Sequence, residues 1–97
     1  MQTDLSVEDV ADIRARLEKL DAGSDKPWTR RTLKLIESNP RVAASKLAAK
    51  VREETLPFKA RVVKLKKLGL TQSFEVGYEI SPRGRVYLEK AGGRRKR

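Results

Sequence analysis

The chain has 97 residues, enough for one domain with a single modest core. It carries 23 Lys and Arg against 13 Asp and Glu, a formal net charge of +10, with no cysteine and no histidine. These two absences exclude disulfides, thiolate chemistry, imidazole bases and the usual transition-metal ligands. We therefore expect no enzyme, no cofactor, no metal site and no small-molecule substrate.

The charge is distributed unevenly along the chain. Residues 1–21 hold three Lys and Arg against six Asp and Glu, a net charge of −3, whereas residues 22–97 hold twenty against seven, a net charge of +13. Such asymmetry favours a polyanionic partner, nucleic acid first and an anionic membrane surface second. The apolar runs are too short for a membrane span, and acids interrupt the first twenty residues, so we expect a cytoplasmic protein.

The first predicted element is a helix within an acidic segment, residues 1–26, that ends in a short linker. Ser6 is placed to cap the helix, Asp9 lies three residues further on, and Gly23 follows its last turn. The apolar residues recur at helical spacing, at Val10, Ile13, Leu17 and Leu20. This stripe either covers the core or forms a homodimer through residues 5–20. The acidic outer face favours a position away from any bound DNA.

Three further helices are predicted, over residues 27–38, 43–51 and 55–68. Pro27 opens the first of these helices, and Pro57 lies in the first turn of the third. Gly69 ends the third helix. Their apolar positions predict a shared core, comprising Trp28, Thr32, Leu35, Ile36, Leu47, Ala48, Val51, Phe58, Val62, Leu65 and Leu68.

A hairpin and a closing helix complete the predicted order. Residues 70–74 and 78–80 are short runs of strand-forming residues, and Gly77 between them suits a tight turn. Ser81 caps and Pro82 opens the last helix, which turns Val86, Tyr87 and Leu88 inward. Residues 92–97, which include the basic run "RRKR", are expected to be a disordered tail.

This order resembles a winged helix-turn-helix with an extra N-terminal helix, an α+β fold that is mainly α. Residues 47–70, "LAAKVREETLPFKARVVKLKKLGL", look like the helix-turn-helix core of MarR- and PadR-like regulators. The segment "YEISPRGRVYL" is similar to the exit of the family's wing, and the chain also resembles small actinobacterial winged-helix proteins. The resemblance implies a three-helix core, a two-strand wing and a closing helix within residues 27–91.

The resemblance further implies binding of double-stranded DNA, with the helix over residues 55–68 in the major groove. The protein would then be a nucleoid-associated binder or a transcription regulator. The candidate contacts are Arg41, Ser45, Lys46, Thr55, Leu56, Lys59, Ala60, Arg61, Lys64, Lys67, Arg83, Arg85, Arg94, Arg95, Lys96 and Arg97. Lys and Arg suit phosphates, whereas Thr55, Leu56 and Ala60 are placed to meet bases.

Two departures from the family pattern predict modest sequence specificity. The start of the recognition helix lacks the Arg, Asn or Gln that read base edges, and the wing tip at residues 75–77 lacks an arginine for the minor groove. Alternatives therefore stay open. Leu56, Ala60 and Val63 form an apolar stripe suited to a protein partner, and the net charge equally suits RNA or the ribosome.

Overall fold

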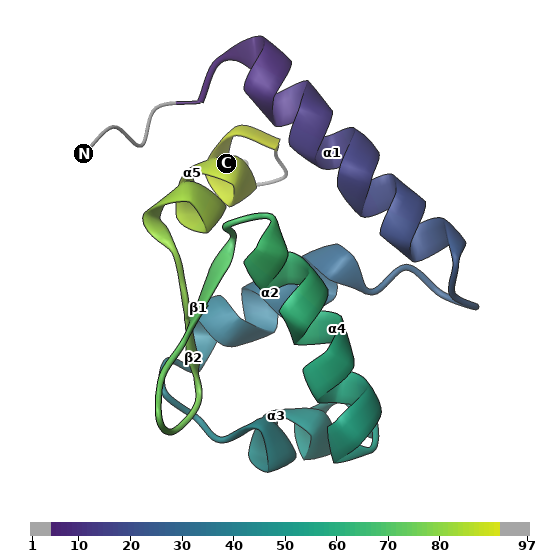
Figure 1. Cartoon of the computed structure of the whole chain (residues 1–97), viewed down its shortest axis with the longest axis vertical. Helices are drawn as coiled ribbons and strands as arrows, with labels where there is room; N and C mark the ends of the chain where they lie inside the picture. Colours follow the sequence, from purple (N-terminus) through teal and green to yellow (C-terminus); the bar gives the residue numbers. More distant parts are fainter. Residues whose placement is uncertain (1–4, 92–97) are drawn as a thin grey trace, which may run out of the picture.

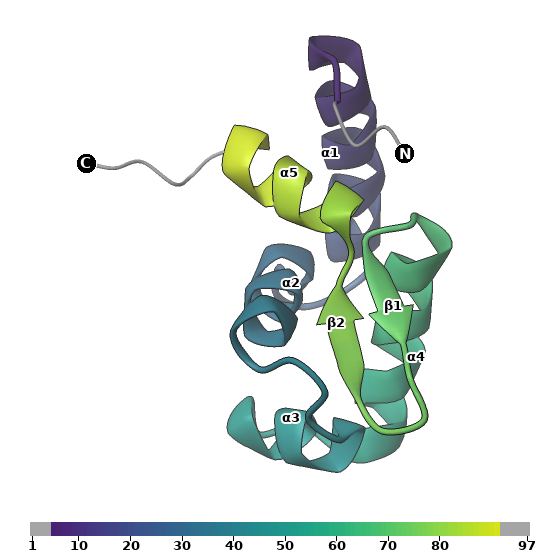
Figure 2. The same ribbon diagram turned by 90° about the vertical axis from the view of Figure 1, so that its left-hand side faces the viewer.

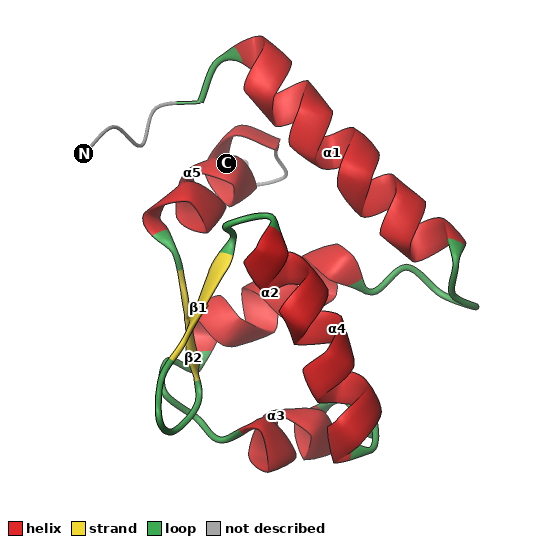
Figure 3. Ribbon diagram, in the orientation of Figure 1, coloured by secondary structure: helices red, strands yellow, loops and turns green. Residues whose placement is uncertain are grey.

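The computed structural model describes residues 5–91, which form five helices and one two-stranded antiparallel sheet (Figure 1, Figure 3). The elements are α1 Val7–Ala22, α2 Thr29–Ser38, α3 Ala44–Lys50, α4 Thr55–Lys67, β1 Thr71–Ser73, β2 Tyr78–Ile80 and α5 Pro82–Ala91. The predicted α+β, mainly helical class and the predicted order of elements are confirmed. The basic tail at residues 92–97 lies outside the described residues. No helix in the described part of the chain combines the length and the apolar character needed to span a membrane.

Helix α1 begins as predicted, with a reciprocal capping box. The Ser6 hydroxyl accepts from the Asp9 amide at 3.0 Å, and the Ser6 amide donates to the Asp9 carboxylate at 3.1 Å. Helix α2 differs from the prediction because it begins at Thr29 instead of residue 27. Trp28 is not helical, with φ −134° and ψ −17°, and its amide donates to the Asp21 carboxylate at 2.7 Å. A side chain from α1 therefore fixes where α2 starts.

Helix α4 ends where the sequence predicts, at a glycine with positive φ. The φ angle of Gly69 is +80°, and its amide donates to the Lys66 carbonyl at 2.9 Å. The Leu70 amide donates to the Leu65 carbonyl at 3.2 Å. This pair of bonds satisfies two terminal carbonyls of α4 and turns the chain directly into β1.

The hairpin pairs Thr71 with Ile80 and Ser73 with Tyr78. Its turn also packs against the segment that joins α2 to α3. The Arg41 amide donates to the Tyr78 carbonyl at 2.7 Å, and a Cβ atom on Gly77 would lie only 2.6 Å from the Val42 amide nitrogen. Only glycine fits this contact, so the hairpin turn is held against the chain before α3.

The core has two parts. The larger part joins α1, α2, α4, α5 and the hairpin through Leu5, Val10, Ile13, Leu17, Trp28, Leu33, Leu65, Leu70, Ile80, Tyr87 and Leu88. The smaller part joins α2, α3, α4 and β2 through Ile36, Leu47, Ala48, Phe58, Val62 and Tyr78. Leu33, which is fully buried, was not predicted. Conversely, four residues predicted to face the core are only partly buried at its edge, namely Leu35, Val51, Leu68 and Val86.

Helix α1 packs on α5 and α2. Val10, Ile13 and Leu17 of its apolar stripe are therefore buried within its own chain, and Leu20 is partly buried. The Arg14 and Lys90 side chains tie α1 and α5 together by donating to the carbonyls of Ala91 and Leu5. A homodimer through residues 5–20 stays a prediction, and a partner copy would meet the outer face of α1. Helix α2 contacts β2 and α4 contacts β1, so the two helices lie on either side of the hairpin (Figure 2).

Candidate nucleic-acid interface

Helix α4 buries one face and exposes the other. Phe58, Val62 and Leu65 are buried. The exposed residues are Leu56, Pro57, Lys59, Ala60, Val63, Lys64, Lys66 and Lys67. No acidic residue occurs anywhere in the helix. Because a helix has 3.6 residues per turn, Ala60, Lys64 and Lys67 follow the side opposite Phe58, and Lys59 lies on its flank. We call the exposed residues of α4 the α4 face.

The lysines of the α4 face have no ion-pair partner among residues 5–91. Lysine ammonium groups on exposed, flexible stems are available to an external anion. Two acids near α4 are paired with arginines, Glu53 with Arg61 and Glu79 with Arg41. Glu54, directly before α4, and Glu75, in the hairpin turn, have no ion-pair partner among residues 5–91. None of these acids pairs with a lysine of the α4 face.

Arg61 is the one candidate of α4 that lies off the α4 face. Its Nη1 atom is 2.7 Å from the Glu53 carboxylate, and its guanidinium lies over the Trp28 ring, 5.5 Å from the ring centroid. Both side chains of the ion pair are about two-thirds buried or more, with 30% and 26% exposed. Arg61 therefore binds the segment before α4 and the start of α2, and a phosphate would have to compete with Glu53 for its guanidinium.

Arg41 is engaged with the hairpin. Its guanidinium stacks on the Phe74 ring, 3.6 Å from the centroid, and its Nε donates to the Glu79 carboxylate at 2.7 Å. Its backbone has a φ of 63°, a conformation that few non-glycine residues adopt. The side chain stays half-exposed at 57%. Arg41 therefore holds the hairpin turn, and a phosphate would have to compete with Glu79 for its guanidinium.

Arg83 and Arg85, at the start of α5, point to different helices. The Arg83 Nε donates to the Leu68 carbonyl at 3.2 Å, at the end of α4. Arg85 pairs instead with Glu37 of α2 at 3.3 Å. Because α2 and α4 lie on either side of the hairpin, the structure brings Arg83 to the end of the α4 face and leaves Arg85 apart from it (Figure 2).

The remaining candidates lie at the starts of α3 and α4. Ser45 and Lys46 are exposed in the first turn of α3, and Thr55 is half-buried as the first residue of α4. Between α3, α4 and the hairpin turn lies a hollow of about 440 Å³, whose lining includes Lys59 and Val63. The four tail residues proposed as contacts, Arg94, Arg95, Lys96 and Arg97, lie outside the described residues.

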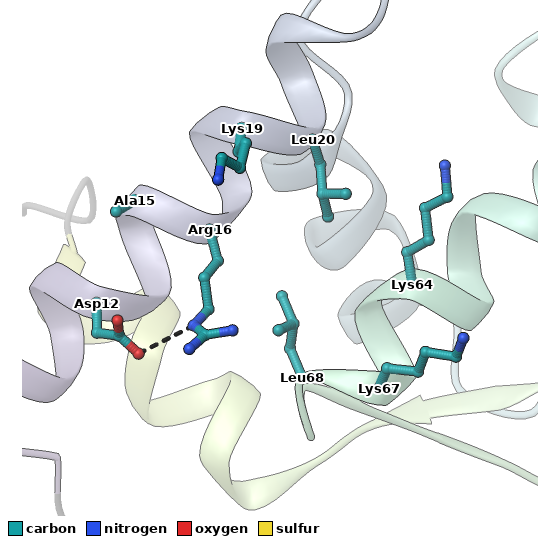
Figure 4. Close-up of a pocket in the computed structure, with 8 residues that line it drawn as sticks. All are labelled: Asp12, Ala15, Arg16, Lys19, Leu20, Lys64, Lys67 and Leu68. Atoms are coloured by element: carbon teal, nitrogen blue, oxygen red, sulfur yellow. Dashed lines mark hydrogen bonds and ion pairs between the residues drawn. The ribbon is translucent and has the colours of Figure 1, made fainter.

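A second hollow of about 560 Å³ separates α4 from α1 (Figure 4). Leu20 and Leu68 point toward one another across it. Its lining carries four cations, Arg16, Lys19, Lys64 and Lys67, and one carboxylate, Asp12. We call it the α1–α4 groove. That the acidic outer face of α1 lies away from bound DNA stays a prediction, but the second half of α1 brings Arg16 and Lys19 into the same groove as two lysines of α4.

Arg16 and Lys19 did not stand out in the sequence, because the segment that contains them has a negative net charge. A weak signal was present. Arg16 and Lys19 are three positions apart on α1, as Lys64 and Lys67 are on α4, and both pairs lie outside the apolar stripe of their helix. Only the tertiary structure shows that the two pairs line a common groove.

Comparisons with models of protein families, with curated proteins and with solved structures found no match for this chain. The resemblance of residues 47–70 to MarR- and PadR-like regulators therefore stays a prediction.

Proposed function

We propose that the protein is a winged-helix binder of double-stranded DNA that acts in the nucleoid or as a transcription regulator, with α4 as the recognition helix. A single α-helix fits the major groove of B-DNA, which is about 12 Å wide. In this arrangement the hairpin is the wing and lies against the neighbouring backbone. The described order of three helices, hairpin and helix after α1 is compatible with this assignment.

The α4 face is the observation that carries the proposal. It presents Lys59, Lys64 and Lys67 to solvent on a helix without a single acid, and these lysines have no ion-pair partner among the described residues. Phosphate contacts by lysine supply affinity that is independent of sequence and depends on salt. Leu56 and Ala60, exposed in the first half of α4, are suited to thymine methyl groups. We therefore propose modest sequence specificity.

The test is a salt titration of binding to a labelled duplex, to the single strand and to a structured RNA. We expect duplex binding to weaken steeply with salt, with a slope of about 0.9 per phosphate contact. Changing Lys64→Glu and Lys67→Glu together should abolish it, whereas Lys34→Glu on α2 is the control. Negligible affinity for the duplex at low salt would rule out DNA binding. Preference for the structured RNA would favour an RNA-associated role instead.

A second candidate, a protein-interaction module, is favoured by a different observation. Among the described residues, three of the four exposed large hydrophobic side chains lie on α4 or the hairpin turn: Leu56 at 76%, Val63 at 48% and Val76 at 59%. Exposed apolar groups gathered in this way are typical of protein contacts. Changing Leu56→Ser and Val63→Ser separates the two functions, since it should leave the salt dependence of duplex binding unchanged and abolish binding to a protein partner.

A further inference from the structure

We propose that the α1–α4 groove is a second phosphate-binding surface, in which Arg16 and Lys19 hold the backbone of the same duplex that receives α4. The inference rests on the proposed function and extends it, because it assigns part of the binding to the helix whose net charge is negative. It also makes α1 a part of the interface in addition to its part in the core.

The groove joins two rows of cations from helices far apart in the sequence. Arg16 and Lys19 lie one helical turn apart on α1, and Lys64 and Lys67 lie one turn apart on α4. Neighbours at this spacing have their Cβ atoms about 5 to 6 Å apart. The first pair lines the groove from α1 and the second pair lines it from α4. In Figure 4 the Arg16 side chain extends toward Leu68, whereas Lys64 and Lys67 extend away from α1 on flexible stems that can turn toward a bound phosphate.

The one carboxylate in the groove is weakly held. Asp12 accepts a hydrogen bond of 3.1 Å from Arg16 Nε, and both side chains are largely exposed, at 62% and 60%. An exposed ion pair within one helix contributes little stability. This bond uses one of the five N–H donors of Arg16, so the two terminal nitrogens remain able to bind a phosphate in the bidentate manner that guanidinium favours.

The shape of the groove suits a polyanion that lies along it. It is open to solvent, and its apolar lining comprises Ala15, Leu20 and Leu68, against which the hydrocarbon stems of the lysines can lie. Lys64 and Lys67 belong to both the α4 face and the groove. A phosphate backbone that borders the DNA groove occupied by α4 therefore continues directly into the α1–α4 groove.

The test compares two pairs of substitutions that remove the same charges at the same spacing. The first is Arg16→Gln with Lys19→Gln on α1. The matched control is Arg31→Gln with Lys34→Gln, which are exposed on α2, the helix on the other side of the hairpin. Duplex affinity is measured from about 50 to about 200 mM salt by fluorescence anisotropy, because this range resolves the slope of the binding constant with salt. Thermal unfolding of each variant checks that the fold is kept.

We expect the α1 pair to lower the magnitude of the slope by about 1.8, or about 0.9 for each lost phosphate contact, and the α2 pair to leave it unchanged. A second measurement is modification of lysines by an amine-reactive reagent, in which the duplex should protect Lys19 and not Lys34. Equal slopes for the two pairs, or no protection of Lys19, overturn the inference. The proposed function then still holds if the variant with Lys64→Glu and Lys67→Glu loses duplex binding. Failure of the unmodified protein to bind the duplex overturns both.

Discussion

The carboxylate of Asp21, in the last turn of α1, caps Thr29, the first residue of α2. Its Oδ1 atom accepts from the Thr29 amide at 2.9 Å, and its Oδ2 atom accepts from the Thr29 hydroxyl at 2.8 Å. The same Oδ1 atom accepts from the Trp28 amide. The residue before α2 offers no side-chain cap of its own. A side chain eight positions upstream thus supplies the acceptor that the start of α2 lacks.

Replacing Asp21 by alanine should destabilise the fold by about 2 kcal/mol, because it removes a charged acceptor shared by three donors at a helix start. Urea unfolding measures the change in the free energy of unfolding. Asp25→Ala is the matched control, since Asp25 is exposed in the same connector, and we expect it to cost less than about 0.5 kcal/mol. Equal losses for both variants would contradict the capping role of Asp21.

Gly84 and Gly23 should respond in opposite ways to alanine. A Cβ atom on Gly84 would collide with the Leu70 carbonyl and lie 3.0 Å from the Ile80 side chain, so Gly84→Ala should destabilise by about 1 to 3 kcal/mol despite its better helix propensity. At Gly23 the nearest atom would be 3.7 Å away and φ is −86°. Gly23→Ala should therefore be neutral or stabilising by less than about 1 kcal/mol. Melting temperatures of the two variants check this, and a stable Gly84→Ala protein would show that α5 can shift away from β1.

Substitutions of Arg61 and Lys64 should affect different properties, the first the stability of the fold and the second the binding of duplex DNA. Arg61→Gln removes a largely buried ion pair with Glu53 and a contact with the Trp28 ring, so we expect the free energy of unfolding to fall by about 1 kcal/mol. The salt dependence of duplex binding should not change. Lys64→Gln should do the reverse, with unchanged stability and a slope lowered by about 0.9. A slope change for Arg61→Gln would show that Arg61 also contacts phosphate.

Tyr78 should make the fold sensitive to high pH. Burial raises the pKa of Tyr78 above its ordinary value of 10.0, because desolvation disfavours the phenolate. The stability that this shift contributes is fully present below pH 10, and it is lost as the pH rises through the raised pKa, where the unfolded chain already releases its proton. We expect the free energy of unfolding to fall above about pH 10 less steeply for Tyr78→Phe than for the unmodified protein. Urea unfolding at neutral pH and at about pH 11 measures the difference, and identical pH profiles would contradict it.

The local signals in the sequence predicted where most helices begin and end. The capping box at Ser6 and Asp9, the glycine that ends α4 and the cap of α5 at Ser81 are all present. Each depends on bonds between residues at most five positions apart, so the sequence carries the whole signal. The predicted start of α2 at Pro27 was two residues too early. The cap of α2 comes from Asp21, a residue of another helix, and the sequence around Pro27 does not indicate such a distant acceptor.

The candidate interface was predictable only in part. The alternation of apolar and basic residues predicted that Lys59, Lys64 and Lys67 face solvent, because helical periodicity alone separates them from Phe58, Val62 and Leu65. The same periodicity could not reveal that Arg61 pairs with Glu53, or that Arg85 reaches Glu37 of another helix. Which acid neutralises which cation depends on distances between elements, and a pattern along one helix does not contain them.

The sequence by itself determined the class of fold, the order of elements and most of the buried residues of each helix, since these follow from local propensity and periodicity, and its composition determined the excess of positive charge. The tertiary structure alone decided which cations share a surface. Packing of α1 on α5 and α2 places Arg16 and Lys19 in the lining of the same groove as Lys64 and Lys67, although a segment of negative net charge carries the first pair. Charge acts through space at a range of several ångströms, so the average along the chain could not predict the groove that folding assembles.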